Sequence, residues 1–195
     1  MQRFNGVVYF DEQAKEHVHV DACTVAAGAF WQGQWRYSVF ACDIPAAESL
    51  HINYKEVLAV TEAVRCWAPK WRGKTVVVHT DSTVTKSVIN KGRARNSLIN
   101  AHLRRMFWIC AQYDCRLYAI SVAGCVNIFA DTISRLHEAG NVARLRGLLS
   151  NWAAGGQCGP LQVTRGNMTQ RSYHFLFRRA GASVGRRANS RAPRL

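Results

Sequence analysis

Four acidic side chains stand inside apolar segments of this chain, where an unpaired carboxylate is costly to bury. Asp21 ends an alternating run, Glu56 lies in an amphipathic stretch, and Asp81 follows a β-branched strand-like run. The fourth acid, Asp131, opens a second amphipathic stretch. Four carboxylates gathered by a fold need a counter-charge, and divalent cations held by oxygen ligands are the natural one. The acids therefore predict a two-metal site for phosphoryl chemistry.

Each acid also has an ordinary structural interpretation, which the sequence leaves open. Asp21 suits the start of a turn, and Asp81 suits the N-cap of a helix. Asp131 falls in a first helical turn, where the helix dipole favours a carboxylate. Glu56 is placed for a capping box with Asn53. The order strand-Asp, helix-Glu, strand-Asp, helix-Asp favours one shared site over four separate explanations.

The helix expected around Glu56 indicates which side this acid occupies. Glu62 shares a polar row with Lys55, so we expect Glu62 on a solvated face. Steps of three and four residues from Glu56 give an apolar row instead, made of Val60, Ala63 and Trp67. Glu56 is therefore expected on the buried side of its helix.

The elements that must position these acids follow from hydrophobic periodicity. Strands are expected at 17–23, 26–31, 35–40, 74–80 and 116–122, and a short strand is compatible with 7–10. Helices are expected at 53–68, 82–89, 96–113 and 127–136, and a further helix is compatible with 142–152. The run 74–80 is apolar on both faces and is expected to be central. A meander followed by alternating strands and helices predicts a mixed α/β fold with helices packed on a sheet.

Charge divides the chain into two parts. The net charge is +14, yet all twelve acids fall at or before Glu138, and residues 139–195 hold ten arginines and no acid. We expect a domain over 1–138 and a basic, largely irregular and flexible C-terminal extension over 139–195. Such asymmetry indicates a polyanionic partner, and the alternative is a disordered arginine-rich end with no specific role.

Cysteine usage and hydropathy address the compartment. Seven cysteines occur without a Cys-x-x-Cys pair, and most have apolar neighbours. This pattern indicates reduced thiols in an intracellular protein, with nucleus or cytoplasm left open. No apolar run reaches membrane-spanning length, and the N-terminus has no signal-peptide pattern, so no membrane association is expected.

Six segments carry a resemblance to a known family: 20–22, 27–31, 52–60, 79–84, 89–91 and 127–135. Together they resemble a ribonuclease H domain, closest to those in the polyproteins of DIRS-type (tyrosine-recombinase) retrotransposons. The N-Y-x-E-x-x-A pattern at 53–59 and the A-D-x-x-S-R pattern at 130–135 are fairly specific to these elements. The resemblance implies a ribonuclease H-like fold, with a five-stranded mixed sheet flanked by helices.

The resemblance also implies an activity and roles for the acids. Such domains hydrolyse the RNA strand of RNA–DNA hybrids with two Mg²⁺ ions, for which Mn²⁺ can substitute. By this analogy Asp21 contacts both metals, and Glu56 holds one metal near the ribose 2′-hydroxyl. Asp81 and Asp131 complete the metal shells. All four acids are then both catalytic residues and metal ligands.

Basic and hydroxyl residues beyond Asp81 are expected to contact the nucleic acid. These contacts would be to backbone phosphates, which gives sequence-independent binding that weakens with salt. The alternative is a solvated basic loop with no bound partner. The residues concerned are Ser82, Thr83, Lys86, Lys91, Arg93 and Arg95.

One position departs from the family pattern. Related domains often carry a His before the last helix, and Ser121 stands there in this chain. Because Ser does not titrate near neutral pH, activity is expected to be reduced or lost if that His is needed. His17 and His19 share the strand face of Asp21 but are expected to fill the strand rather than line the site.

Two alternatives remain open beside the hybrid-cleaving enzyme. One is a non-catalytic nucleic-acid-binding remnant of the same fold, which the Ser121 position favours. The other is a nuclease or integrase-like relative that acts on DNA. Integrase-type sites usually need three acids, so a fourth acid favours the ribonuclease. Oligomeric state is not predicted.

Overall fold

The computed structural model of the 195-residue chain describes residues 15–155. The strand considered at 7–10 and the extension beyond residue 155 lie outside the described residues.

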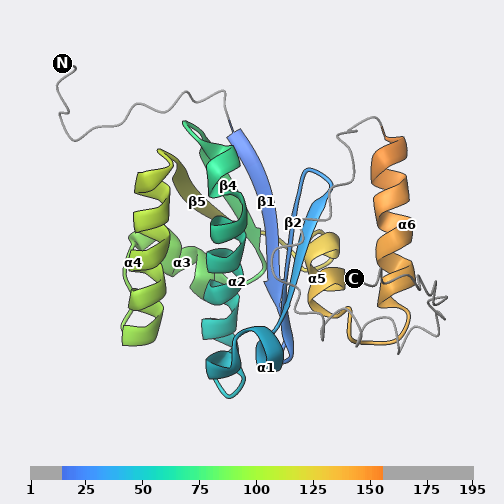
Figure 1. Cartoon of the computed structure of the whole chain (residues 1–195), viewed down its shortest axis with the longest axis horizontal. Coiled ribbons are helices and arrows are strands. Elements are labelled where there is room, and N and C mark those ends of the chain that lie inside the picture. Colours follow the sequence, from blue (N-terminus) through green and yellow to red (C-terminus); the bar gives the residue numbers. More distant parts are fainter. Residues whose placement is uncertain (1–14, 156–195) are drawn as a thin grey trace, which may run out of the picture.

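Within residues 15–155 five strands form one mixed sheet in the order β3-β2-β1-β4-β5 (Figure 1). The pairs β1–β2 and β2–β3 are antiparallel, as a meander requires, whereas β1–β4 and β4–β5 are parallel. Both β1 and β4 have neighbours on each side, which explains their runs of buried valines. The mixed α/β fold predicted from the sequence is confirmed. The strands are β1 Lys15–Ala22, β2 Ala26–Trp31, β3 Gln34–Val39, β4 Thr75–Thr80 and β5 Arg116–Ser121.

The helices follow the predicted order with differences at their ends. The segment expected as a loop over 43–51 contains the end of the short helix α1 and one 3₁₀ turn, η1. The helix α2 begins one residue before the expected cap, Asn53, because the His51 ring accepts a hydrogen bond from the Asn53 N–H at 3.1 Å. The bounds are α1 Phe40–Asp43, η1 Pro45–Ala47, α2 Ile52–Trp67, η2 Ala68–Trp71, α3 Thr83–Lys91, α4 Ser97–Gln112, α5 Ile128–Ser134 and α6 Asn141–Ala154.

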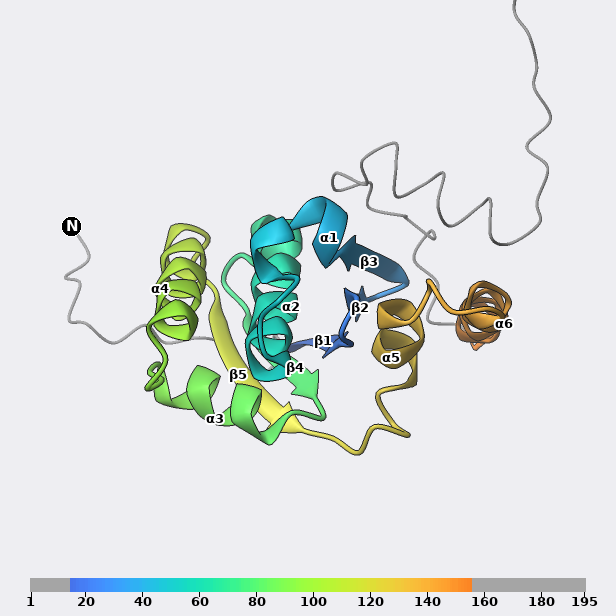
Figure 2. The same ribbon diagram turned by 90° about the horizontal axis from the view of Figure 1, so that it is seen from below.

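Helices cover the two faces of the sheet unequally (Figure 2). Against one face pack α2 and, beside it, α4, and this layer contains the larger core. Three tryptophans pack together in that core, and the ring centroid of Trp31 lies 5.8 Å from those of Trp67 and Trp71. The other face carries α5 over β1 and β2, followed by α6. The layers therefore place the ends of β1 and β4 between α2 and α5.

A smaller core joins α5 and α6 to the antiparallel part of the sheet. Phe30 stacks on Phe129 with centroids 4.1 Å apart, and Leu145 is buried among the same group. The ring of Trp152 lies over Gly33, whose positive φ of 76° and missing side chain make room for it. The helix considered at 142–152 is thus present and packed, whereas the domain boundary at residue 138 stays a prediction.

Helix α3 closes the outer edge of the sheet at β5. The side chain of Asn90 both donates to the carbonyl oxygen and accepts from the N–H of Ala119, each at 2.8 Å. An edge strand exposes such unpaired backbone groups, and a side-chain amide satisfies both at once. This contact fixes α3, which begins two residues after Asp81, against the sheet.

No helix within residues 15–155 combines the length and hydropathy needed to cross a membrane. The six cysteines of this part of the chain are free thiols.

Candidate active site

Three of the four predicted acids meet at one edge of the sheet. Asp21 lies at the end of β1, Asp81 comes directly after β4, and Glu56 lies in the second turn of α2. One carboxylate oxygen from each lies within 4.8 Å of the others. Parallel neighbouring strands end at the same edge, which explains why Asp21 and Asp81 meet although they are far apart in sequence. We call Asp21, Glu56 and Asp81 the carboxylate cluster.

Glu56 reaches the cluster because of its helical face. Its row mates Val60, Ala63 and Trp67 are fully buried, as predicted, and Glu56 itself is 6% exposed. The capping-box interpretation of Glu56 is not supported, since His51 caps the helix. Burial on the inner face of α2 therefore delivers a carboxylate to the end of β1.

The cluster holds more negative charge than its surroundings balance. Burial, and then the neighbouring Asp21 and Asp81 carboxylates, raise the pKa of Glu56 to about 9. Burial also raises the pKa of Asp21, while a hydrogen bond from Ser134 opposes that rise. The Oε2 atom of Glu56 is buried with no hydrogen-bond partner among the described residues. Closely spaced carboxylates with an unpartnered oxygen fit a divalent cation with oxygen ligands.

Asp131 lies beside the carboxylate cluster rather than inside it. It occupies the first turn of α5, as predicted, and its Oδ1 accepts a hydrogen bond from the Arg135 guanidinium at 2.8 Å. The Asp131 charge contributes to the raised pKa of Asp21, so the two carboxyl groups influence each other. The fourth predicted acid is thus near the cluster but already has a cationic partner.

Two residues that carried no predicted role bring α5 to the site. The Ser134 hydroxyl donates to Asp21 Oδ2 at 2.5 Å. Gly28 pairs with Asp21 across β1 and β2, and a Cβ there would lie 2.6 Å from the Ala130 carbonyl oxygen and closer still to the Ser134 nitrogen. Only a glycine lets the backbone of α5 approach the sheet at this point. A glycine inside a strand is a signal of close backbone approach, but the sequence does not show which segment approaches it.

Asn127 connects the start of α5 to β1. Its side chain donates to the Val20 carbonyl oxygen at 2.8 Å and makes a 3.2 Å hydrogen bond with His19. Asn127 precedes the first residue of α5, as predicted, yet it makes no side-chain capping bond. Its amide instead fixes α5 next to the residue that precedes Asp21.

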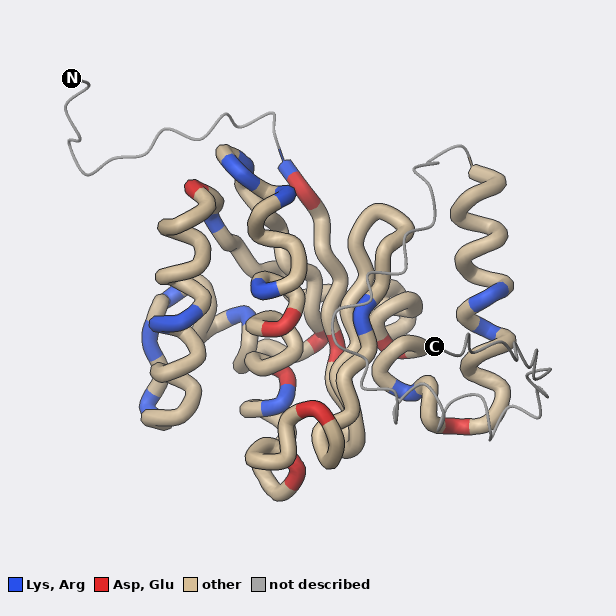
Figure 3. Tube along the Cα trace, in the orientation of Figure 1, with Lys and Arg blue, Asp and Glu red and all other residues tan. Residues whose placement is uncertain are grey.

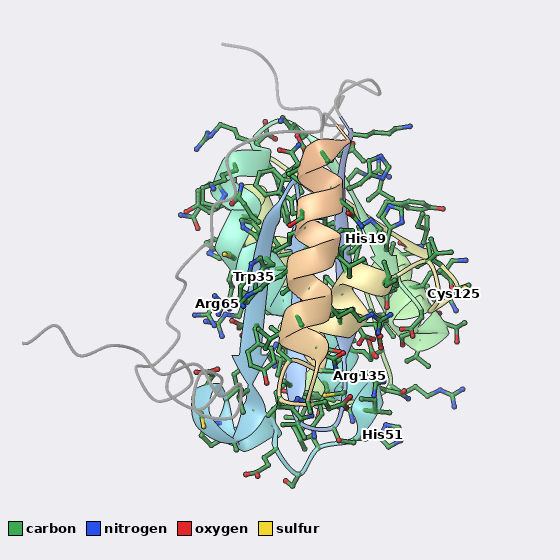
Figure 4. The ribbon with its side chains drawn as sticks, turned by 90° about the vertical axis from the view of Figure 1, so that its right-hand side faces the viewer. His19, Trp35, His51, Arg65, Cys125 and Arg135 are labelled. Carbon is green, nitrogen blue, oxygen red and sulfur yellow. The ribbon has the colours of Figure 1, made fainter. Side chains whose placement is uncertain are left out.

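The histidines of β1 form contacts within the sheet. His19 stacks on His79 with ring centroids 4.4 Å apart, and His17 hydrogen-bonds His79 at 2.9 Å. Figure 4 faces the α5 side of the molecule and labels both His19 and Arg135 there. Burial lowers the pKa of His19 and lowers that of His79 to about 4. Sheet contacts therefore account for these rings, in agreement with the expectation that they fill the strand.

Ser121 is the last residue of β5 and pairs with Thr80, the residue before Asp81. The loop that follows passes close to the cluster, because a Cβ on Gly124 would lie 3.6 Å from Asp81 Oδ2. No histidine occurs in 121–127. The departure noted in the sequence therefore lies next to the carboxylates.

The predicted nucleic-acid contacts lie on α3 and the loop after it. Ser82 has a structural task, since its hydroxyl caps α3 by accepting from the Thr85 N–H at 3.2 Å. The other five residues are exposed, and the basic ones form no ion pair within residues 15–155. These five are Thr83, Lys86, Lys91, Arg93 and Arg95. The positive charge of the four basic residues is free to meet an external anion.

Comparison with known proteins identifies a family for this chain. No curated protein matches the chain. Among solved structures, the crystal structure of RNase H1 from the halophilic archaeon Halobacterium salinarum NRC-1 is similar at 13% identity, with a TM-score of 0.47, covering 61% of this chain and 93% of that chain. The family described as "RNase H-like domain found in reverse transcriptase" matches residues 11–113, which is more than half of the chain and includes the carboxylate cluster. The chain belongs to this family of reverse-transcriptase RNase H-like domains.

Proposed function

We propose that this domain hydrolyses the RNA strand of RNA–DNA hybrids with two Mg²⁺ ions, for which Mn²⁺ can substitute. The observation that carries the proposal is the carboxylate cluster, whose oxygens converge within 4.8 Å without a basic partner in residues 15–155. Asp21, Glu56 and Asp81 would hold the metal, and Asp131 would complete the shell from α5. Divalent ions supply, when bound, charge neutralisation and Lewis-acid stabilisation of phosphate oxygens.

The protein groups around the cluster have distinct tasks in this proposal. Ser134 orients the Asp21 carboxylate through its 2.5 Å hydrogen bond and favours the ionised form that a metal needs. Glu56 has a fixed position on α2, and we assign it the place next to the ribose 2′-hydroxyl. A 2′-hydroxyl displayed in a wide minor groove lets such a site distinguish RNA from DNA.

The substrate backbone would follow the exposed residues that come after Asp81. Lys86, Lys91, Arg93 and Arg95 would bind phosphates, and Thr83 would add a hydroxyl contact at the start of α3. Ser82 caps α3 with its hydroxyl oxygen, and its hydroxyl hydrogen would be donated to a phosphate. Binding would be insensitive to sequence and would weaken as salt concentration rises.

We further propose that the domain derives from a DIRS-type retrotransposon. The closing A-D-x-x-S-R pattern gains a physical meaning, since Ser134 bonds Asp21 and Arg135 bonds Asp131. Because Ser134 and Arg135 each hold one of the acids, we expect both residues of the pattern to be kept in related domains that keep the site.

Hybrid cleavage in Mg²⁺ tests the proposal, with Asp81→Asn as the test variant and Asp114→Asn as its matched control. Asp114 is also exposed and sits at a φ of 51°, which Asn tolerates well. We expect the natural chain and Asp114→Asn to cut only the RNA strand, and Asp81→Asn to lose cutting. Hybrid binding without cleavage in all three would instead support a non-catalytic domain, and cleavage of duplex DNA would support the integrase-like alternative.

A further inference from the structure

The solvent face of α4 carries two adjacent aromatic side chains that the proposed function does not use. Phe107 is 76% exposed and Trp108 is 73% exposed. All six tryptophans lie in the described residues, and the other five are buried or half-buried. A large exposed aromatic pair on a helix that otherwise packs well indicates a binding surface.

Helical geometry sets basic groups beside these rings. The buried side of α4 is formed by Ile99, Leu103, Met106 and Cys110. Trp108 lies on the opposite side of the helix from these four residues. Arg104 and Arg105 precede Trp108 by four and three residues, so both guanidinium groups lie one turn away on the same side. Arg104, Arg105, Phe107 and Trp108 are all exposed, and we call them the α4 surface.

The stretch of chain that contains the α4 surface is basic. No acid occurs between Asp81 and Asp114, whereas six basic residues do. Figure 3 shows basic colouring on α3, the following loop and α4, and an acidic residue only at the end of α4 that leads into β5. Neither Arg104 nor Arg105 forms an ion pair within residues 15–155. The surface is therefore complementary to an anion that also offers flat apolar faces.

We propose that the α4 surface binds single-stranded nucleic acid. Unpaired bases would stack on Trp108 and Phe107, and the adjoining phosphates would contact Arg104 and Arg105. Stacking on aromatic side chains with nearby cations is the mode by which proteins hold unpaired strands without sequence preference. Paired bases hide their faces inside the duplex, so this surface selects the unpaired strand.

The α4 surface is separate from the carboxylate cluster. Trp108 lies near the end of α4, which leads into the first residues of β5, whereas the cluster lies at the edge where β1 and β4 end. Because β4 and β5 are parallel, Trp108 lies near the end of the sheet where these strands begin, and the cluster lies at the end where β4 stops. The inference goes beyond the proposed cleavage, and under both proposals a hybrid with an unpaired overhang would contact both places.

Binding of a fluorescein-labelled single-stranded DNA 20-mer, measured by anisotropy without divalent cations, tests the inference. DNA is not cut by a hybrid-specific enzyme, so the result does not depend on the proposed activity. We expect Trp108→Ala to weaken binding about ten-fold, and Trp108→Phe to retain most of it because a stacking ring remains. Tyr118→Ala, which removes a 49% exposed ring from β5, is the matched control and should bind as the natural chain does.

Two further readouts distinguish stacking from phosphate binding. Single-stranded DNA should quench the fluorescence of exposed Trp108, and this quenching should disappear in Trp108→Ala. The double variant Arg104→Gln, Arg105→Gln should lower the slope of log affinity against log salt by about 0.7 for each phosphate that the protein no longer neutralises. Thermal unfolding of each variant should match that of the natural chain, since the four side chains are exposed.

Unchanged single-strand binding in Trp108→Ala would overturn the inference. So would a dimer in the natural chain that Trp108→Ala converts to a monomer while DNA binding persists, because the surface would then bind protein. Single-strand binding that depends on Trp108 in a chain without hybrid cleavage would support this inference and reject the proposed function.

Discussion

Buried acids occur in two settings in this molecule, and the contrast between them identifies the site. Glu16 and Glu62 are 7% and 5% exposed, and Asp21 and Glu56 are 5% and 6% exposed. These four carboxyl groups are therefore buried to the same extent, yet the charge of Glu16 is balanced by other side chains. It pairs with Lys74 and accepts hydrogen bonds from Trp31 and Gln32 at 2.9 and 2.7 Å.

Glu62 is compensated in the same way. It pairs with Arg36 at 2.6 Å and with Arg65 at 2.8 Å, so the prediction of a solvated face for Glu62 was wrong. Asp21 and Glu56 form no ion pair within residues 15–155. The comparison teaches that burial alone does not mark a functional acid, whereas burial without a counter-charge leaves a place for a cation.

The largest expected difference between the two settings is in activity. Glu56→Gln should reduce hybrid cleavage more than about 100-fold, since loss of a ligand should exceed the 10- to 100-fold effect of losing an outer-shell partner. Glu62→Gln should leave cleavage by the folded protein close to that of the natural chain. Steady-state cleavage rates at saturating Mg²⁺ measure both, and equal losses in the two variants would remove the distinction.

Stability should change in the opposite pattern. Glu62→Gln leaves Arg36 without its carboxylate and should lower the free energy of unfolding by about 1–3 kcal/mol. Glu56→Gln removes a buried carboxyl group that must take up a proton on folding at neutral pH, because its pKa is about 9 in the fold. The variant should therefore leave the metal-free protein as stable as the natural chain or more so. Urea unfolding in a chelator measures both. A destabilised Glu56→Gln would mean that this side chain has compensation that the structure does not indicate.

Ser134→Ala should have a smaller effect. Without the hydroxyl the Asp21 carboxylate loses a donor, so its pKa should rise further and its hold on a cation should weaken about ten-fold. Ser134→Thr keeps the hydroxyl and is the conservative control. Cleavage rate against Mg²⁺ concentration gives the readout, and a Ser134→Ala curve identical to that of the natural chain would assign the hydrogen bond to packing alone.

The same carboxyl group should also make stability depend on pH. The pKa of Glu56 is about 9 in the fold against an ordinary value of 4.5, so between these values the folded chain binds more protons than the unfolded chain. The free energy of unfolding should therefore fall as pH rises through this window in metal-free protein. Thermal unfolding across the window should show that this slope is reduced in Glu56→Gln. A slope of the same size in both proteins would contradict the assignment.

Local patterns made much of the fold predictable. Alternation in β1, β-branched residues in β4 and the apolar row through Val60 and Trp67 each report on a neighbourhood of a few residues. Asp21, Glu56 and Asp81 could be selected because such runs surround them.

Contacts between distant segments were not predictable. Arg36 reaches Glu62 from β3, so the burial of Glu62 depends on a partner outside its own helix. Ser134 bonds Asp21 across 113 residues, and Gly28 matters only because α5 passes over it. The pairing of Asp131 with Arg135 differs, because these residues are four apart, a spacing at which helical side chains meet, so the sequence does indicate it.

Calorimetric titration of Mg²⁺ into the metal-free natural chain and into Glu56→Gln, both at neutral pH, tests the carboxylate cluster most directly. We expect saturable binding of two ions to the natural chain, with a release of protons, and a loss of at least one of these ions in the variant. Indistinguishable titrations of the two proteins would contradict the account, because the buried carboxylate of Glu56 would then have no part in holding a cation.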